Sequence, residues 1–384
     1  MGMKRITAWV LLTAICLAAL ILPVSAAPEI TAPSALLMEA ETGKVLFEEN
    51  AHERLRPASV TKIMTLLLVM EALESGKISW DDTVTASASA VAKGGSQVYL
   101  REGEQMTMEE MVKSVVVASA NDCATALAEH VCGSESAFVE EMNRRAQELG
   151  MNDTHFVNCT GLDDAPEAAE HLTSAADIAV MSRELLKHGK IRDYTTIWMD
   201  TVRNGEFGLT NTNKLVRFYE GTTGLKTGFT SSAGYCLSAS ARRDGMELIA
   251  VVMHCPTSSD RFESAKAMLN YGFASYALLY PEPPEPLAPV PVNLGQEDSV
   301  LPVLSGDWAV LVEKAQKAAA VCEVELAEEL DAPVEAGRQI GTLTVRAGDE
   351  ILAELPLTAE REVPRLDWWQ ITVRLLRDLC GAGL

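Results

Sequence analysis

A serine and a lysine three positions apart, Ser59 and Lys62, lie at the start of a strongly apolar stretch, residues 60–73, that is predicted to be a helix. Residues at i and i+3 share one face of a helix, so the lysine amine can reach the serine hydroxyl. A serine hydroxyl is a weak nucleophile that needs an adjacent base. A lysine serves as that base when burial or a second positive charge, for which Lys226 is the candidate, lowers its pKa. Ser-x-x-Lys also arises by chance about once in a chain of this length, so an ordinary solvated helix surface is the alternative.

Two further short motifs follow in the chain. The Ser-Ala-Asn motif at residues 119–121 stands where a predicted helical stretch, residues 108–130, is interrupted, and these residue types are common at such breaks for purely structural reasons. The Lys-Thr-Gly motif at residues 226–228 is rarer, expected by chance in about one chain in ten. Its lysine and threonine can donate hydrogen bonds to an anion, and its glycine leaves room for a ligand backbone. A strand end with a basic residue is the alternative.

The order of the three motifs resembles that of the class A β-lactamases and penicillin-binding proteins, which combine S-x-x-K, S-D-N and K-T-G. Residues 57–65, 119–129 and 224–230 look like the motif segments of the low-molecular-mass D-alanyl-D-alanine carboxypeptidases, peptidase family S11. The resemblance covers residues 34–273 closely and extends more loosely over the part of the chain that follows.

The resemblance implies a serine-type D-Ala-D-Ala carboxypeptidase that uses no cofactor, in which Ser59 is the nucleophile and Lys62 is the base. Ser119 matches the hydroxyl that passes protons toward the leaving group. In the family reaction the serine attacks the penultimate carbonyl of a peptidoglycan stem peptide ending in D-Ala-D-Ala, the terminal D-alanine leaves, and water hydrolyses the acyl-enzyme. Penicillins imitate the acyl donor, so β-lactams are expected to be covalent inhibitors.

The substrate-binding groups implied by the resemblance lie mainly in the second and third motifs. The side-chain amide of Asn121 matches the group that holds the substrate backbone. Lys226 and Thr227 match the pair that orders the hydroxyl network and binds the C-terminal carboxylate of the substrate. The backbone N–H groups of Ser59 and Phe229 match the oxyanion hole, where two fixed donors meet developing negative charge.

Two flanking positions, Gly228 and Arg261, are also assigned to the substrate site. The glycine of the third motif has no side chain to obstruct a ligand. Arg261 falls where the family places a further arginine that recognises a carboxylate, and a structural role before a helix is an equal alternative for it.

Two other functions remain open on the residues. A class A-like β-lactamase carries a deacylating glutamate in a Glu-x-x-Leu-Asn pattern. The corresponding segment here, residues 166–171, has Glu167 and Glu170 without the Leu-Asn and is typical of a solvated acidic loop. A non-catalytic muropeptide- or penicillin-binding protein is the other alternative, and the intact motifs count against it.

The elements that must hold these residues alternate between helical and strand patterns over residues 30–279. Hairpins are predicted at residues 35–47 and 234–254. Strands at both ends of a domain favour one antiparallel sheet assembled from distant segments and flanked by helices. This is an α/β (α+β) fold, which the resemblance implies to be of the β-lactamase/DD-peptidase type. The helices between the hairpins are predicted at residues 60–73, at residues 108–130 with a break near Ser119, and at residues 177–188.

A proline-rich segment, residues 280–291, is predicted to be an extended linker, because proline is excluded from helix interiors and central strands. Residues 292–363 show short strand-like runs separated by turn signals, which predicts a small all-β domain. The last stretch, residues 364–384, is predicted to be an amphipathic helix that lies in a membrane surface, with docking on the β domain as the alternative.

The N-terminus, residues 1–26, has the pattern of a secretory signal peptide. Lys4 and Arg5 precede an apolar run that ends in small residues. The protein is therefore expected to be exported to the outer face of the cytoplasmic membrane or the cell-wall space. An uncleaved membrane anchor is the alternative.

The composition limits the partners. The 384 residues carry 32 Lys+Arg against 54 Asp+Glu, a formal charge of −22, so nucleic acid is not an expected partner. The eight cysteines include no Cys-x-x-Cys pair and the six histidines show no ligand spacing, so no metal site is predicted. The thiols are expected to be buried as small hydrophobic groups.

Overall fold

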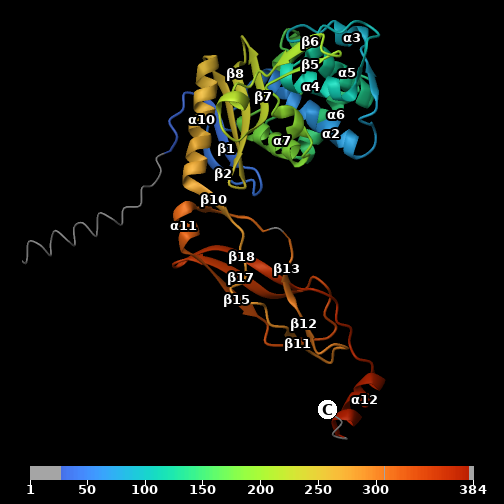
Figure 1. Cartoon of the computed structure of the whole chain (residues 1–384), viewed down its shortest axis with the longest axis vertical. Helices are drawn as coiled ribbons and strands as arrows, with labels where there is room; N and C mark the ends of the chain where they lie inside the picture. Colours follow the sequence, from blue (N-terminus) through green and yellow to red (C-terminus); the bar gives the residue numbers. More distant parts are fainter. Residues whose placement is uncertain (1–26, 307, 380–384) are drawn as a thin grey trace, which may run out of the picture. The chain divides into compact units, whose positions relative to one another are not determined.

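The computed structural model describes residues 27–306 and 308–379 (Figure 1). The predicted signal peptide, residues 1–26, lies outside the described residues, as does the end of the predicted tail helix from Cys380 onward. Two compact units divide the chain after Ser275, and each is described by itself.

The centre of the first unit is a five-stranded antiparallel sheet with the strand order β2-β1-β9-β8-β7. β1 pairs with both β2 and β9, so the first hairpin of the chain joins the last strands of the unit, and the predicted assembly from distant segments is confirmed. Asp244 and Gly245 turn the β8–β9 hairpin with φ of 49° and 83°, a backbone geometry that suits the twist of a tight hairpin. The strands are β1 (Ser34–Glu39), β2 (Val45–Glu49), β7 (Thr222–Thr230), β8 (Gly234–Arg243) and β9 (Met246–Cys255).

Helices α10 (Ser258–Ser275) and α7 (Ala175–Lys187) cover the two faces of this sheet (Figure 1). A Cβ built on Gly272 would lie only 2.5 Å from the Leu248 side chain of β9, so the absence of a side chain lets α10 approach the sheet. The flanking helices of the predicted fold are therefore confirmed.

A helical layer next to α7 is built around α2 (Lys62–Glu74). Ten of the 13 residues of α2 are buried, as expected of a helix that is apolar all round. The other members of the layer are the 3-10 turn η1 (Ala58–Thr61), α4 (Met108–Ala118), α5 (Asn121–Cys132) and α6 (Glu135–Glu148). The smaller elements of the unit are β3 (Thr83–Thr85), α3 (Ala88–Val91), β4 (Gln105–Thr107), η2 (Pro166–Glu170), α8 (Ile191–Thr195), β5 (Met199–Val202), β6 (Phe207–Thr210) and α9 (Leu215–Phe218).

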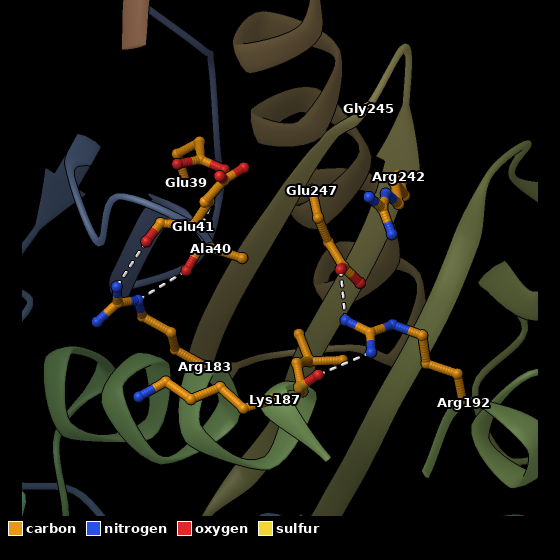
Figure 2. A pocket seen from close by; sticks show the side chains of 10 residues that line it. Glu39, Ala40, Glu41, Arg183, Lys187, Arg192, Arg242, Gly245 and Glu247 are labelled. Carbon is orange, nitrogen blue, oxygen red and sulfur yellow. Dashed lines mark hydrogen bonds and ion pairs between the residues drawn. The ribbon is translucent and has the colours of Figure 1, made fainter. Parts of the chain in front are cut away.

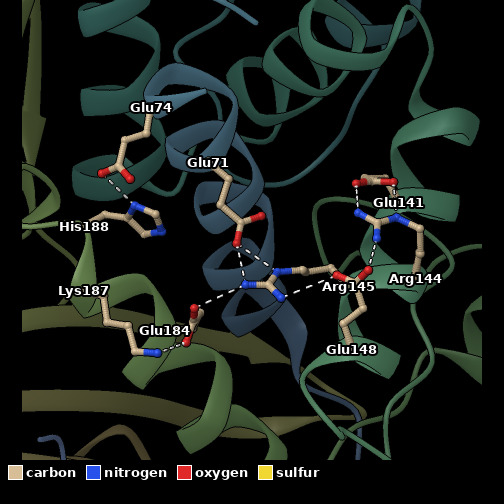
Figure 3. Close-up of polar contacts among 9 residues, drawn as sticks. All are labelled: Glu71, Glu74, Glu141, Arg144, Arg145, Glu148, Glu184, Lys187 and His188. Atoms are coloured by element: carbon tan, nitrogen blue, oxygen red, sulfur yellow. Dashed lines mark hydrogen bonds and ion pairs between the residues drawn. The ribbon is translucent and has the colours of Figure 1, made fainter. Parts of the chain in front are cut away.

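An ion-pair network ties three of these helices together at the end of α2 away from Ser59 (Figure 3). Arg145 of α6 lies 2.8 Å from Glu71 of α2 and 3.2 Å from Glu184 of α7, and it also contacts Glu148 one turn further along its own helix. Neighbouring Arg144 pairs only with carboxylates of its own helix, Glu141 and Glu148. The network therefore links helices through one guanidinium.

The second unit is mainly β-structure, which confirms the predicted small β domain. Its four-stranded antiparallel sheet has the order β13-β18-β17-β15, and a three-stranded sheet has the order β12-β11-β16. β10 and β14 form a separate antiparallel pair. The elements are β10 (Tyr276–Leu279), β11 (Val290–Asn293), β12 (Ser299–Val300), β13 (Pro302–Leu304), β14 (Val310–Glu313), α11 (Lys314–Ala319), β15 (Ala320–Leu326), β16 (Leu330–Asp331), β17 (Gln339–Ala347) and β18 (Glu350–Ala359).

The proline-rich segment differs from its prediction at one end. β11 begins at Val290, inside the predicted linker, and it is the middle strand of its sheet although it contains Pro291. Val290 and Val292 are buried in the core of the unit, whereas Pro291 faces outward. Alternating burial of the two valines, together with the short length of the pairing, outweighs the missing N–H of the proline.

Helix α12 (Trp368–Leu379) ends the described chain. Asp367 caps its first turn, because Gln370 N–H donates to the Asp367 carboxylate at 2.7 Å. Trp368 is 75% exposed, and several other large apolar side chains of this helix are also exposed. Among the described residues, no helix is long and apolar enough to cross a membrane.

Candidate active site

The turn η1 and the first residue of α2 bring the serine and lysine of the first motif into contact. Lys62 Nζ donates to Ser59 Oγ at 2.9 Å and to the Thr160 carbonyl at 2.7 Å. The lysine is fully buried, whereas the serine is partly accessible. A nucleophile that faces solvent thus has a buried amine behind it.

Burial lowers the pKa of Lys62 to about 7. The shift is due to burial, and the contribution expected from the charge of Lys226 is not found. The charge of Lys62 instead affects Lys226. Burial, followed by the charges of Lys62 and Arg261, holds the pKa of Lys226 well below its usual range. Both lysines are therefore buried amines whose charged forms are disfavoured.

The second motif lies at the break between α4 and α5, as predicted. Ser119 has a left-handed backbone with φ of 61°, which ends α4 and lets a new helix begin at Asn121. The Asn121 side-chain amide donates to the Gly94 carbonyl at 2.7 Å, so its orientation is fixed. Its Oδ1 is buried and has no hydrogen-bond partner within the described part of the chain. An acceptor in that state is suited to an N–H group of a ligand.

The third motif lies in β7, the last strand in the order of the sheet. Lys226 Nζ donates to the Thr227 carbonyl at 2.8 Å, and the Thr227 hydroxyl donates to Thr212 Oγ1 at 2.7 Å. A Cβ built on Gly228 would lie 2.6 Å from the Pro57 carbonyl and 3.1 Å from Ser59 N. Glycine is therefore required for β7 to pack against the turn that carries the serine.

Phe229 follows this contact directly. Its side chain is 52% exposed and stacks on Tyr235 of the neighbouring strand, with ring centroids 4.2 Å apart. The close approach at Gly228 places the backbone of β7 beside Ser59 N, which is where the resemblance puts the two donors of an oxyanion hole.

Arg261 projects from α10 toward the motif strand from the other face of the sheet. Its Nη1 donates to the Gly228 carbonyl at 3.1 Å and to the Cys236 carbonyl at 3.4 Å, and the side chain is almost fully buried. These contacts let the guanidinium support the backbone of the third motif. Its Nε is buried without a hydrogen-bond partner among the described residues, and recognition of a substrate carboxylate by Arg261 stays a prediction.

The sequence argument missed several residues that build the site. Thr160 holds Lys62, Thr212 holds Thr227, and Asp122 holds the loop next to Asn121 by accepting from the N–H groups of Val98 and Leu100. The only early signal was the position of Asp122 directly after the second motif. Thr160 and Thr212 lie on loops away from the motifs that they hold, where a single sequence carries no pattern for them.

The acidic loop considered for β-lactamase chemistry is solvated in the structure. Glu167 and Glu170 lie on η2 and both are exposed. Among the described residues, no group of three histidine, cysteine or carboxylate side chains is placed to hold a metal ion.

The family model for D-alanyl-D-alanine carboxypeptidases, Peptidase S11, matches residues 23–257, which contain all three motifs. The chain belongs to peptidase family S11. A second family model, for the C-terminal domain of penicillin-binding protein 5, matches residues 284–365 of this S11 chain.

Relatives of the S11 chain span nearly its whole length. D-alanyl-D-alanine carboxypeptidase DacF of Bacillus subtilis is 40% identical over 353 residues, which is 90% of each chain. The crystal structure of penicillin-binding protein 5 from Haemophilus influenzae has a TM-score of 0.78 at 31% identity and covers 88% of this chain and 99% of its own. An ampicillin-bound structure of penicillin-binding protein D2 from Listeria monocytogenes has a TM-score of 0.58 at 31% identity, covering 64% of this chain and 98% of its own.

These matches confirm three predictions made from the sequence: the family, the DD-peptidase-type fold with a C-terminal β domain, and the class of enzyme, a serine carboxypeptidase.

Proposed function

We propose that this S11 enzyme removes the terminal D-alanine from peptidoglycan stem peptides ending in D-Ala-D-Ala, through an acyl-enzyme on Ser59. The observation that carries the proposal is the 2.9 Å contact between Ser59 Oγ and the buried amine of Lys62, whose pKa is lowered to about 7. About half of such amines are neutral at pH 7, and a neutral amine can accept the serine proton.

Acylation begins when Lys62 Nζ accepts the proton of Ser59 Oγ and the oxygen attacks the penultimate carbonyl carbon. The N–H groups of Ser59 and Phe229 donate to the oxygen that becomes negative. Ser119 passes a proton to the amine of the departing D-alanine. Water then attacks the acyl-enzyme, and the carboxylate product leaves with Ser59 restored.

Two buried groups of the site that lack protein partners orient the substrate. Asn121 has an acceptor without a donor, and Lys226 has an amine without a paired carboxylate. The orphan Oδ1 of Asn121 accepts a substrate N–H. Lys226 and Thr227 receive the terminal carboxylate, because a bound anion would supply the negative charge that the buried Lys226 lacks among the described residues. β-Lactams carry a comparable carboxylate and carbonyl, so we propose that they acylate Ser59 in the same orientation.

The test uses the purified chain from residue 27 onward with diacetyl-L-Lys-D-Ala-D-Ala and, separately, a fluorescent penicillin. We expect release of D-alanine and stable labelling, both abolished in Ser59→Ala. Absence of D-alanine release would contradict the carboxypeptidase proposal. Labelling with no release would favour the non-catalytic binder, and fast hydrolysis of the penicillin would favour the β-lactamase.

We also propose that the protein is exported and rests on a membrane surface through α12. The exposed apolar side chains of this helix are suited to an interfacial position, and the acidic remainder of the chain gives no electrostatic attraction to an anionic surface. They are Trp368, Trp369, Val373, Leu375 and Leu376.

Liposome flotation of the chain from residue 27 tests this attachment, with a chain that ends at Pro364 as the control. We expect only the longer chain to float. Equal behaviour of the two chains would contradict a membrane role for α12, and would favour docking of the helix on its own β domain.

A further inference from the structure

The peptide unit between Ala58 and Ser59 connects the proposed oxyanion hole to the interior of the protein. Its N–H belongs to Ser59 and its carbonyl to Ala58. A trans peptide is planar, and its C=O and N–H point in opposite directions. Whatever holds the Ala58 carbonyl therefore also sets the direction of the Ser59 N–H.

A chain of three hydrogen bonds holds that carbonyl. The Thr61 hydroxyl donates to the Ala58 carbonyl at 2.8 Å, and His171 Nε2 lies 2.8 Å from the same hydroxyl oxygen. The N–H of Val157 donates to His171 Nδ1 at 3.1 Å. Because Nδ1 accepts, the ring proton of a neutral imidazole is on Nε2 and is donated to Thr61. All three donors thus point the same way, from the Val157 backbone to the Ala58 carbonyl.

The chain is sealed from solvent. Thr61 and His171 are both buried, and burial, followed by the charge of His155, lowers the pKa of His171 to about 4, so the ring is neutral at neutral pH. Gly161 closes the other side: a Cβ there would lie 1.8 Å from the Ala58 carbonyl oxygen and 2.8 Å from Thr61 Oγ1. Hydrogen bonds arranged in series polarise one another in such surroundings.

Ala58 itself needs this support. Its φ of 47° is in the left-handed region, which alanine adopts at a cost because of its Cβ. A backbone held in that region persists when neighbouring contacts determine it. The Thr61 hydroxyl supplies one such contact at the carbonyl of the strained residue itself.

We infer that Thr61 and His171 are positioning residues for acylation: their hydrogen-bond chain fixes the Ala58–Ser59 peptide plane so that the Ser59 N–H faces the developing oxyanion. Neither side chain touches the substrate in this role. The inference rests on the proposed function, since it gives the Ser59 N–H a reacting partner.

The test compares Thr61→Val, which keeps the shape of the side chain but removes the hydroxyl, with Thr61→Ser, which keeps the hydroxyl. Loss of a whole oxyanion donor lowers kcat by about 10²–10³-fold, so a misdirected donor should lower it by about tenfold. We expect Thr61→Val to reduce kcat for D-alanine release and the rate of penicillin acylation by this factor with little change in KM. Thr61→Ser should retain most of both rates.

Two controls separate positioning from general destabilisation. Arg145→Met lies in the ion-pair network away from the site and should lower the thermal unfolding temperature without lowering kcat. His171→Phe removes the donor to Thr61 but leaves the hydroxyl free to bond the Ala58 carbonyl, so its loss of kcat should be smaller than that of Thr61→Val. Wild-type rates in Thr61→Val, or equal losses in Thr61→Val and Thr61→Ser, would overturn the inference.

NMR of the Ser59 amide tests the direction of its N–H without measuring turnover. The amide proton resonance of Ser59 and its hydrogen-exchange rate should change in Thr61→Val and remain near wild type in Thr61→Ser. An unchanged Ser59 amide in Thr61→Val would overturn the inference. A wild-type enzyme that releases no D-alanine would instead contradict the proposed function, and the Ser59 amide would still report whether Thr61 sets its direction.

Discussion

Two regions of the first unit differ in whether their buried or half-buried basic side chains form ion pairs. In the active site, the hydrogen bonds of Lys62 and Lys226 go to a hydroxyl and to backbone carbonyls, and neither lysine forms an ion pair with a described carboxylate. At the far end of α2, Arg145 meets carboxylates from three helices (Figure 3). A pairing carboxylate would favour the charged lysine and raise its pKa, whereas burial without one lowers it.

A pocket at the end of the sheet is also lined by basic side chains (Figure 2). It has a volume of about 200 Å³, and two of the arginines that line it, Arg183 and Arg192, already donate to acceptors of the protein. Arg183 donates to the carbonyls of Ala40 and Glu41 at 2.7 Å each, and Arg192 donates to Glu247 at 2.6 Å. Cationic residues in a hollow are thus not sufficient for a site. What distinguishes the active site is that its two buried lysines form no ion pair with a described carboxylate, in a chain with 54 acidic residues.

Replacing the unpaired lysine should give the largest effect. Lys62→Met removes the base, and loss of a general base typically costs up to about 10⁴-fold, so we expect D-alanine release to fall by at least about 10³-fold. Because no ion pair is broken and a buried amine is removed, the thermal unfolding temperature should not decrease. Loss of activity that arises only because the variant unfolds at a lower temperature would contradict this expectation.

The pH dependence of acylation should show the lowered pKa directly. Below about pH 7 the Lys62 amine becomes protonated and can no longer accept the Ser59 proton, so the rate should fall about tenfold per pH unit. Above that pH the amine is neutral and the rate should level off. Stopped-flow labelling with a fluorescent penicillin between pH 5 and 8 measures this. A flat profile from pH 5 to 7 would mean that Lys62 is not the base.

The paired arginine should behave in the opposite manner. Arg145→Met leaves Glu71 and Glu184 without their shared guanidinium, which should lower the free energy of unfolding by about 1–2 kcal/mol. Urea denaturation measures this loss. Penicillin acylation in the folded variant should match wild type, and a large drop in acylation would show that the two regions are coupled.

The smallest effect is expected at the neighbouring arginine. Arg144 is half exposed and pairs only with residues of its own helix, so Arg144→Ala should change the free energy of unfolding by less than about 0.5 kcal/mol. A loss as large as that of Arg145→Met would show that the number of ion pairs, and not the linking of helices, determines stability in this network.

The features that could be predicted from the sequence are those that depend on short-range patterns. The Ser59–Lys62 contact follows from i,i+3 spacing, the break at Ser119 from residue type, and the outer hairpins from alternating apolar residues and turn residues. These need only a few neighbouring positions, so one sequence is sufficient.

The remainder depends on contacts between distant segments. Thr160 is 98 residues from Lys62 and His171 is 110 residues from Thr61, and no periodicity marks either of them in advance. The direction of influence between Lys62 and Lys226 likewise depends on how deeply each is buried, which is a property of the packed structure. The linker also ends earlier than predicted, because β11 begins at Val290. Burial of Val290 and Val292 depends on the partner strands, which the local sequence does not reveal.

If the substrate lies along β7, as the proposed function implies, the place of this strand at the edge of the sheet also limits what the enzyme can discriminate. A peptide that lies along an open strand edge is read through its main chain, which is the same whatever its side chains. Selection would then depend on the free carboxylate that the proposed function places near Lys226. Under that proposal, stem peptides that differ further upstream should compete on nearly equal terms.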